Sequence, residues 1–234
     1  MHDDTDALRA RRTLLKNGLV LAGSLAVPSA VAVAADRKLT SRDLAPVTPP
    51  PHPRRPVVAR PVTSPRVVRP ELMRRALAAL DKHGNRVKRD RMAIVDFGAK
   101  SAEARFHFVD LVSGRSTSTR VCHGSGSDPA HTGWLQRFSN VHGSNATSEG
   151  AYATADYYHG KHAKSQRLHG LDPTNSNALA RAIVIHGAWY ANPDVLRTRG
   201  MLGRSQGCFA FAEDELESVF ARLGPNRLIY AAKV

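Results

Sequence analysis

Cys208 and His186 are the two residues whose types and surroundings best fit a chemical reaction. Cys208 follows the polar segment 204–207 (RSQG), which ends in a glycine. His186 closes the apolar, β-branched run 183–185 (IVI) and is followed by Gly187. A thiol becomes a strong nucleophile when a neighbouring base takes its proton, and imidazole can do this near neutral pH. The pair therefore predicts acyl transfer by a cysteine.

The glycines beside these two residues strengthen the prediction. The backbone N–H groups of Gly207 and Cys208 are expected to point into one space beside the thiol, as an oxyanion site requires. Ser205 is expected to hydrogen-bond locally and hold this turn, and Gly187 lets a substrate approach the backbone. Taken singly, the histidine fits a core position and the cysteine fits a small buried hydrophobe. Taken together, they favour catalysis.

Short β-like runs and two helices must position these residues. An apolar stripe predicts a helix over residues 71–83, which Gly84 ends. An amphipathic pattern predicts a second helix at 213–223. Residues 123–177 are rich in Gly, Ser, His and Asn, which indicates a long loop region of the kind that carries function. Strands are predicted at 92–97, 105–111, 116–122, 182–186 and 227–233, so the fold class is mainly β with small peripheral helices.

The first 35 residues are typical of an export signal. Arg11 and Arg12 precede a weakly apolar run at 19–35 that contains the small-residue motif 32–34 (AVA), and the arrangement resembles a twin-arginine signal. It predicts cleavage and export to the periplasm or cell envelope. The alternative is an uncleaved anchor helix, which Pro28 and the shortness of the run disfavour.

A linker and one domain are predicted to follow. Residues 36–70 hold nine of the 14 prolines and predict an extended linker, and residues 71–234 suit a single catalytic domain with a helix at 71–84 and a core at 90–234. Residues 36–91 carry 15 Lys/Arg and 5 Asp/Glu, a net charge of +10, whereas residues 92–234 carry 15 and 12, a net charge of +3. The basic segment is expected either to bind anionic envelope polymers or to be a solubilising spacer. Nucleic acid is not an expected partner.

The motifs resemble those of the YkuD-like L,D-transpeptidases of peptidoglycan, in the subgroup called murein L,D-transpeptidase catalytic domains. His186-Gly187, a spacer and Ser205-x-Gly207-Cys208 match the core signature. The resemblance covers about residues 90–234 and includes 123–127 (HGSGS), 138–140 (FSN), 150–154 (GAYAT), 160–162 (GKH) and 168–171 (LHGL). It implies a β-sandwich-like catalytic domain. It also implies acyl transfer from the bond between an L-centre and D-Ala in a stem peptide to an amine, with no metal and no cofactor.

Carried over to this chain, the resemblance makes Cys208 the nucleophile of a thioacyl-enzyme and His186 the base. Gly207 and Cys208 supply the oxyanion site, with Ser205 beside them. Gln206 stands where the broader family often has histidine, which fits the subgroup. The residues expected to bind substrate are Tyr152, Thr154, Gly187, Arg204, Gln206 and His123.

The remaining histidines and the second cysteine leave several interpretations open. His123, beside Cys122, fits a cleft wall and a structural loop position equally well. The histidines at 142, 159, 162 and 169 lack metal-ligand spacing, so solvated or substrate-facing roles are favoured over a zinc site. A disulfide between the two cysteines is disfavoured because one lies in a predicted strand and the other in a glycine turn.

Three functions stay open at this stage. The first is the L,D-transpeptidase acting on peptidoglycan stem peptides, with cross-linking or L,D-carboxypeptidase activity as the outcome, in a chain expected to be a monomer. The second is a sortase-like transpeptidase, which shares the order His then Cys and would use Arg222 or Arg227. The third is a catalytically inert cell-wall-binding module.

Overall fold

The structure is a computed structural model that describes residues 67–234. The predicted export signal at 1–35, and the part of the predicted linker before residue 67, lie outside the described residues. Val68 was assigned to the linker, but it is buried in the domain, and Arg69 pairs with Asp96. The folded domain therefore includes residues 67–70. Within the described part, no helix has the length and apolar character to cross a membrane.

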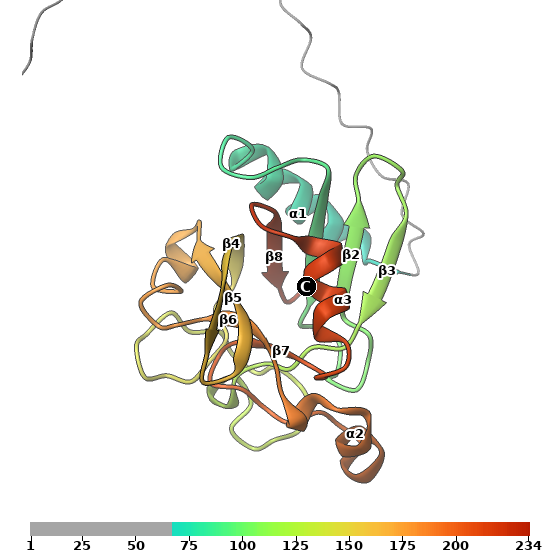
Figure 1. Cartoon of the computed structure of the whole chain (residues 1–234), viewed down its shortest axis with the longest axis vertical. Helices are drawn as coiled ribbons and strands as arrows, with labels where there is room; N and C mark the ends of the chain where they lie inside the picture. Colours follow the sequence, from blue (N-terminus) through green and yellow to red (C-terminus); the bar gives the residue numbers. More distant parts are fainter. Residues whose placement is uncertain (1–66) are drawn as a thin grey trace, which may run out of the picture. The chain divides into compact units, whose positions relative to one another are not determined.

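The predicted mainly β fold is confirmed: eight strands form one mixed sheet (Figure 1). The strands are β1 (Arg91–Asp96), β2 (Phe106–Asp110), β3 (Ser116–Thr119), β4 (Gly150–Gly160), β5 (Ala163–Gly170), β6 (Val184–Gly187), β7 (Phe209–Phe211) and β8 (Leu228–Ala232). Their order across the sheet is β3-β2-β1-β8-β4-β5-β6-β7. The pairs β1–β8 and β6–β7 are parallel, and every other pair is antiparallel.

The sheet curls so that its two ends approach one another. Phe106 of β2 and Phe211 of β7 are far apart in strand order, yet their ring centroids lie 4.9 Å apart. Just beyond β3, the backbone N–H of Cys122 donates to the carbonyl of Ala210 in β7. The helix α3 (Leu216–Leu223) lies between the two parts of the sheet (Figure 1), and its apolar face joins their shared core. A core enclosed between two parts of a sheet gives the sandwich-like arrangement that was expected.

The helix α1 (Pro70–Lys82) covers the other face of the central strands. Alternation in β1 sends Ala93 and Val95 into the enclosed core and Met92 and Ile94 toward α1, as a period of two requires. The predicted helix at 71–83 agrees with α1. The helix predicted at 213–223 begins later, at Leu216.

The prediction of a continuous loop over 123–177 is wrong in its second half. Residues 128–149 contain no helix or strand, but β4 and β5 then form the longest hairpin of the sheet. Its strands hold glycine, histidine and lysine where β-branched residues would mark a strand, so their pairing depends on the neighbouring strands. The sequence analysis also missed β7 and the helix α2 (Pro193–Arg199).

Candidate active site

A cleft of about 660 Å³ opens at the beginning of the parallel strands β6 and β7. Alternate residues Ala182, Val184 and His186 face it from β6 and the segment before it, and Cys208 faces it from the turn before β7. The other walls are formed by His142, Gly143, Asn145, Tyr158, Lys161, His162, Ala180, Arg181, Tyr190, Arg204, Ser205 and Gln206. The cleft thus brings together the predicted nucleophile and the predicted base.

The turn that carries Cys208 is rigid because of its glycine and its serine. Gly207 has φ of +112°, and a Cβ there would lie 2.7 Å from the Ala146 carbonyl oxygen. The Ser205 hydroxyl donates to the Cys208 carbonyl at 2.7 Å and accepts from the Gly207 N–H at 3.1 Å. The expected local role of Ser205 is therefore present. An oxyanion role for the Gly207 N–H requires this last bond to open.

The Cys208 thiol is held as a neutral donor in this structure. Its Sγ donates to the carbonyl oxygen of Ala182 at 3.5 Å, and the residue is half-buried. Burial raises the pKa of the thiol, while the backbone N–H of Val184 and the charge of Arg181 oppose that rise. The resting group is consequently a thiol, which needs a base at the moment of attack.

The His186 imidazole is suited to be that base. The residue is completely buried, and Nδ1 lies 2.9 Å from the Gly187 carbonyl oxygen, so Nδ1 carries the proton that it donates. Nε2 has no hydrogen-bond partner among the described residues. Burial lowers the pKa of His186 to about 4, the Gly187 carbonyl opposes this, and nearby His162 lowers the pKa further. The ring is therefore neutral near pH 7, with an open acceptor nitrogen.

The charged side chains that line the cleft are all basic. Lys161, Arg181 and Arg204 face it and no carboxylate does. Within residues 67–234, none of these three forms an ion pair. Lys161 lies in the turn of the β4–β5 hairpin. Two other basic residues of that hairpin, Lys164 and Arg167, lie outside the cleft, and each pairs with a carboxylate. The cleft therefore keeps uncompensated positive charge.

Arg181 fixes the loop that forms one wall. Its guanidinium donates to the carbonyls of Ser139 and Ala146 and to the hydroxyls of Ser144 and Ser148. All four acceptors are uncharged, so the arginine ties down the loop and still contributes a full positive charge beside the thiol.

Tyr152 and Thr154 do not face the cleft, contrary to the expectation that they bind substrate. Tyr152 is completely buried, its hydroxyl donates to the Ser148 carbonyl, and its ring packs edge-on against Phe209. The Thr154 hydroxyl donates to the Gly224 carbonyl. Both belong to the same inward face of β4, which packs into the core.

His123 is also a structural residue and does not line the cleft wall. Its Nδ1 accepts from the fully buried guanidinium of Arg105 at 2.8 Å, and its Nε2 lies 3.4 Å from the Asp128 carboxylate. Burial lowers the pKa of His123 to about 3, and the charge of Arg105 lowers it further. The ring is therefore a neutral bridge between a buried cation and a buried anion.

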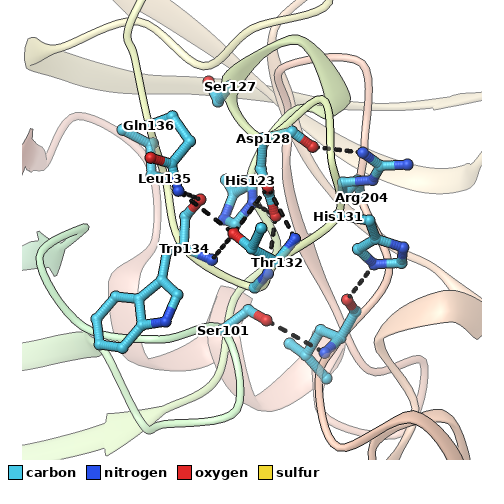
Figure 2. Close-up of polar contacts among 12 residues, drawn as sticks. Ser101, His123, Ser127, Asp128, His131, Thr132, Trp134, Leu135, Gln136 and Arg204 are labelled. Atoms are coloured by element: carbon cyan, nitrogen blue, oxygen red, sulfur yellow. Dashed lines mark hydrogen bonds and ion pairs between the residues drawn. The ribbon is translucent and has the colours of Figure 1, made fainter.

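Asp128 connects this bridge to the cleft (Figure 2). Burial opposes ionisation of its carboxylate, but the backbone N–H groups of Thr132 and Gly133 hold its pKa below the usual range. The carbonyl of Asp128 accepts from Arg204, which lines the cleft (Figure 2). The network supports the cleft from behind, and it does not itself face the cleft.

Of the other predicted residues, Arg204 and Gln206 line the cleft, whereas Gly187 does not. The sequence analysis assigned no role to Arg181 or Lys161, although Lys161 lies in the motif 160–162 (GKH). His142 and His162 had been noted as candidates for substrate contact, and both line the cleft. Both cysteines are free thiols, and Cys122 is buried. No cluster of three or more metal-binding side chains occurs in the described part of the chain.

Comparison with known families gives one match that covers most of the chain. Residues 65–232 match the family described as the L,D-transpeptidase catalytic domain. No curated protein matches the sequence.

Two solved structures are among those that the chain is similar to. An L,D-transpeptidase from Mycobacterium tuberculosis is 12% identical, with 61% of this chain and 57% of that chain covered and a TM-score of 0.35. The helical cell shape determining protein Pgp2 from Campylobacter jejuni is 14% identical, with 66% and 53% covered and a TM-score of 0.38. The chain spans about half to three fifths of the length of the solved structures that it matches.

Proposed function

The chain belongs to the L,D-transpeptidase catalytic domain family, and from this we propose that it is a cysteine acyltransferase acting on peptidoglycan stem peptides. The single observation that carries the proposal is the pairing in one cleft of a free thiol, Cys208, with a buried neutral imidazole, His186, whose Nε2 is unpartnered. Three basic side chains around them fit a donor peptide that bears carboxylates.

In the first half-reaction, the thiol attacks the carbonyl carbon between the L-centre and D-Ala. Rotation of Sγ away from Ala182 lets His186 Nε2 take the thiol proton as the carbon–sulfur bond forms. The carbonyl oxygen becomes an oxyanion, and the Cys208 N–H is the group proposed to stabilise it. When the carbon–nitrogen bond breaks, the imidazolium gives its proton to the leaving amine of D-Ala, and a thioester remains on Cys208.

In the second half-reaction, an acceptor attacks the thioester carbonyl. His186 removes a proton from the acceptor, the carbon–sulfur bond breaks, and the thiolate recovers the proton from the imidazolium. An amine acceptor gives cross-linking, and water gives L,D-carboxypeptidase activity. Both outcomes use the same two side chains. No metal or cofactor enters either step.

The sortase-like alternative would use Arg222 or Arg227, the two arginines that follow the cysteine in the chain. Arg222 donates to the Thr117 hydroxyl and Arg227 pairs with Asp90, and neither lines the cleft. This favours the transpeptidase proposal. Export to the periplasm or cell envelope, where stem peptides are accessible, remains part of the proposal and rests on residues 1–35.

The test is the intact mass of the full chain after exposure to a carbapenem, which a transpeptidase thiol is expected to open and retain. Wild type and Cys122→Ala should gain one drug-sized adduct, because Cys122 is buried away from the cleft. Cys208→Ala should gain none. Wild type should also release D-Ala from tetrapeptide stems, and Cys208→Ala should not.

Two results would overturn the assignment. One is release of D-Ala by Cys208→Ala at the wild-type rate. The other is a folded wild type that forms no adduct and releases no D-Ala, which would point to an inert wall-binding module.

A further inference from the structure

We propose that His162, in the turn between β4 and β5, is a positioning residue for His186. Its ring covers the base, holds the plane of the imidazole and keeps Nε2 available to the thiol. The inference rests on the proposed function, because it concerns the same base.

The two imidazoles are stacked face to face. Their ring centroids lie 4.1 Å apart and the planes are inclined by 25°. His186 is completely buried, whereas His162 is exposed and lines the cleft, so His162 lies on the solvent side of the base. A ring stacked in this way limits rotation of its partner and keeps water from one of its faces.

The hairpin does not need this imidazole for its own stability. The strands pair up to the turn, with Gly160 opposite Ala163, and ion pairs from Lys164 and Arg167 brace the outer surface. Within the described residues, the His162 side chain makes no hydrogen bond or ion pair. Among the described residues, the recorded contact of its ring is the stack on His186.

Among residues 67–234, the lining of the cleft includes no carboxylate that would favour a proton on the His186 ring. The hairpin contributes Lys161 and Tyr158, and β6 itself contributes only the Gly187 carbonyl. The other titratable or charged groups that line the cleft are His142, Arg181, Tyr190, Arg204 and Cys208. His162 opposes a proton on the His186 ring, whose centroid lies 4.1 Å from its own.

Loss of His162 should change the pKa of His186 in one direction. His186 works as a base only when neutral, and its pKa is already lowered to about 4 by burial, with His162 adding to the effect. Removing His162 exposes the ring and removes the opposing charge. Both changes raise the pKa of His186, so activity should be lost at a higher pH when the solution is acidified.

The experiment measures the second-order rate constant for acylation of the full chain by a carbapenem, across the pH range in which each variant stays folded. In His162→Ala, the acid limb, which is the fall of the rate constant at low pH, should shift to a pH about one unit higher. The plateau, which is the rate constant above that fall, should be about tenfold lower. In His162→Phe, which keeps an aromatic ring over the base, the plateau should stay near wild type and the limb should move less. His159→Ala is the matched control, since His159 is an exposed histidine of the same hairpin outside the cleft.

An acid limb of His162→Ala that superimposes on that of wild type overturns the inference. So does a His162→Phe variant that loses as much plateau rate as His162→Ala, because stacking would then not be the relevant contact. Either result leaves the proposed function standing. Failure of the proposed function is recognised separately, because wild type would then form no adduct at any pH.

Discussion

At the scale of single residues, the backbone at Gly207 sets the position of the thiol. Its φ of +112° is one that side-chain-bearing residues avoid, and a Cβ would lie 2.7 Å from the Ala146 oxygen and 2.9 Å from the Ile183 Cδ1. Neither neighbour can retreat easily, because Ala146 O also accepts from Arg181 and Ile183 belongs to the enclosed core.

Gly207→Ala should therefore cost about 2–3 kcal/mol of unfolding free energy and abolish carbapenem acylation, because the turn must shift. Urea unfolding and intact mass measure the two effects. Gly200→Ala is the matched control: Gly200 also has positive φ, but a Cβ there meets nothing within 4 Å, so a loss of only about 1 kcal/mol is expected. Equal losses in the two variants would contradict the steric argument.

The buried bridge behind the cleft gives a second prediction at this scale. Asp128→Asn should lower the unfolding free energy by about 3 kcal/mol, because Arg105 and His123 would lose the buried anion of their bridge. The difference in unfolding free energy between wild type and Asp128→Asn should shrink in acid. The pKa of Asp128 is lowered in the folded state, so the stabilisation that its carboxylate gives to wild type is lost as pH falls through the folded-state pKa. Urea unfolding at neutral and acid pH measures both effects.

The control for Asp128 is Asp156→Asn. Asp156 pairs with Arg167 on the surface, so its loss should cost less than about 1 kcal/mol at any pH. A loss in Asp128→Asn no larger than in this control would show that the bridge does not stabilise the fold.

Sequence reasoning brought together five residues that share the cleft: Cys208, His186, Arg204, Ser205 and Gln206. It misassigned Tyr152 because the role came from the resemblance of the motif 150–154, which does not say which face of β4 meets the cleft. Arg181, Lys161 and the stack on His186 could not be predicted. Arg181 depends on how the loop before β4 lies against the segment before β6, and the other two depend on the position of the β4–β5 hairpin.

At the scale of elements, this hairpin is the part of the sheet that local sequence describes least well and that the cleft depends on most. Its ladder to β6 places Ser165 opposite His186, so the turn at Lys161 and His162 reaches over the base. By contrast, β1, β8 and α1 carry clear apolar periodicity, and they were predicted within one or two residues. Function thus depends on the element whose pairing is set by its neighbours.

Lys161 tests the role of the turn in recognising the donor. Lys161→Gln should lower the rate of D-Ala release from a stem peptide with a free carboxylate on its third residue by about fivefold, and should have a smaller effect on the amidated peptide. Lys164→Gln is the matched control, because Lys164 pairs with Glu217 and lies outside the cleft. Equal effects of Lys161→Gln on both peptides would show that its charge does not contact that carboxylate.

At the scale of the whole molecule, positive charge is densest in the N-terminal segment 36–66, with a net charge of +5 over 31 residues, and is more dilute in residues 67–234, with +8 over 168 residues. Residues 36–66 carry seven Lys/Arg and two Asp/Glu, and they precede the first described residue. The cleft lies wholly within residues 142–208. Chemistry and attachment to an anionic envelope should therefore be separable by mutation.

Deletion of residues 36–66 should leave carbapenem acylation unchanged and weaken retention on purified sacculi at low salt. The deletion must end at 66, because Val68 is buried and Arg69 pairs with Asp96, so a cut at residue 70 would also destabilise the domain. A full-length variant with the seven basic residues changed to Gln separates charge from length, and it should lose retention to the same extent. Added salt should remove the difference between wild type and both variants, since screening shortens the range of the attraction. Retention that both variants keep at low salt would show that this segment is a spacer and not an envelope-binding tail.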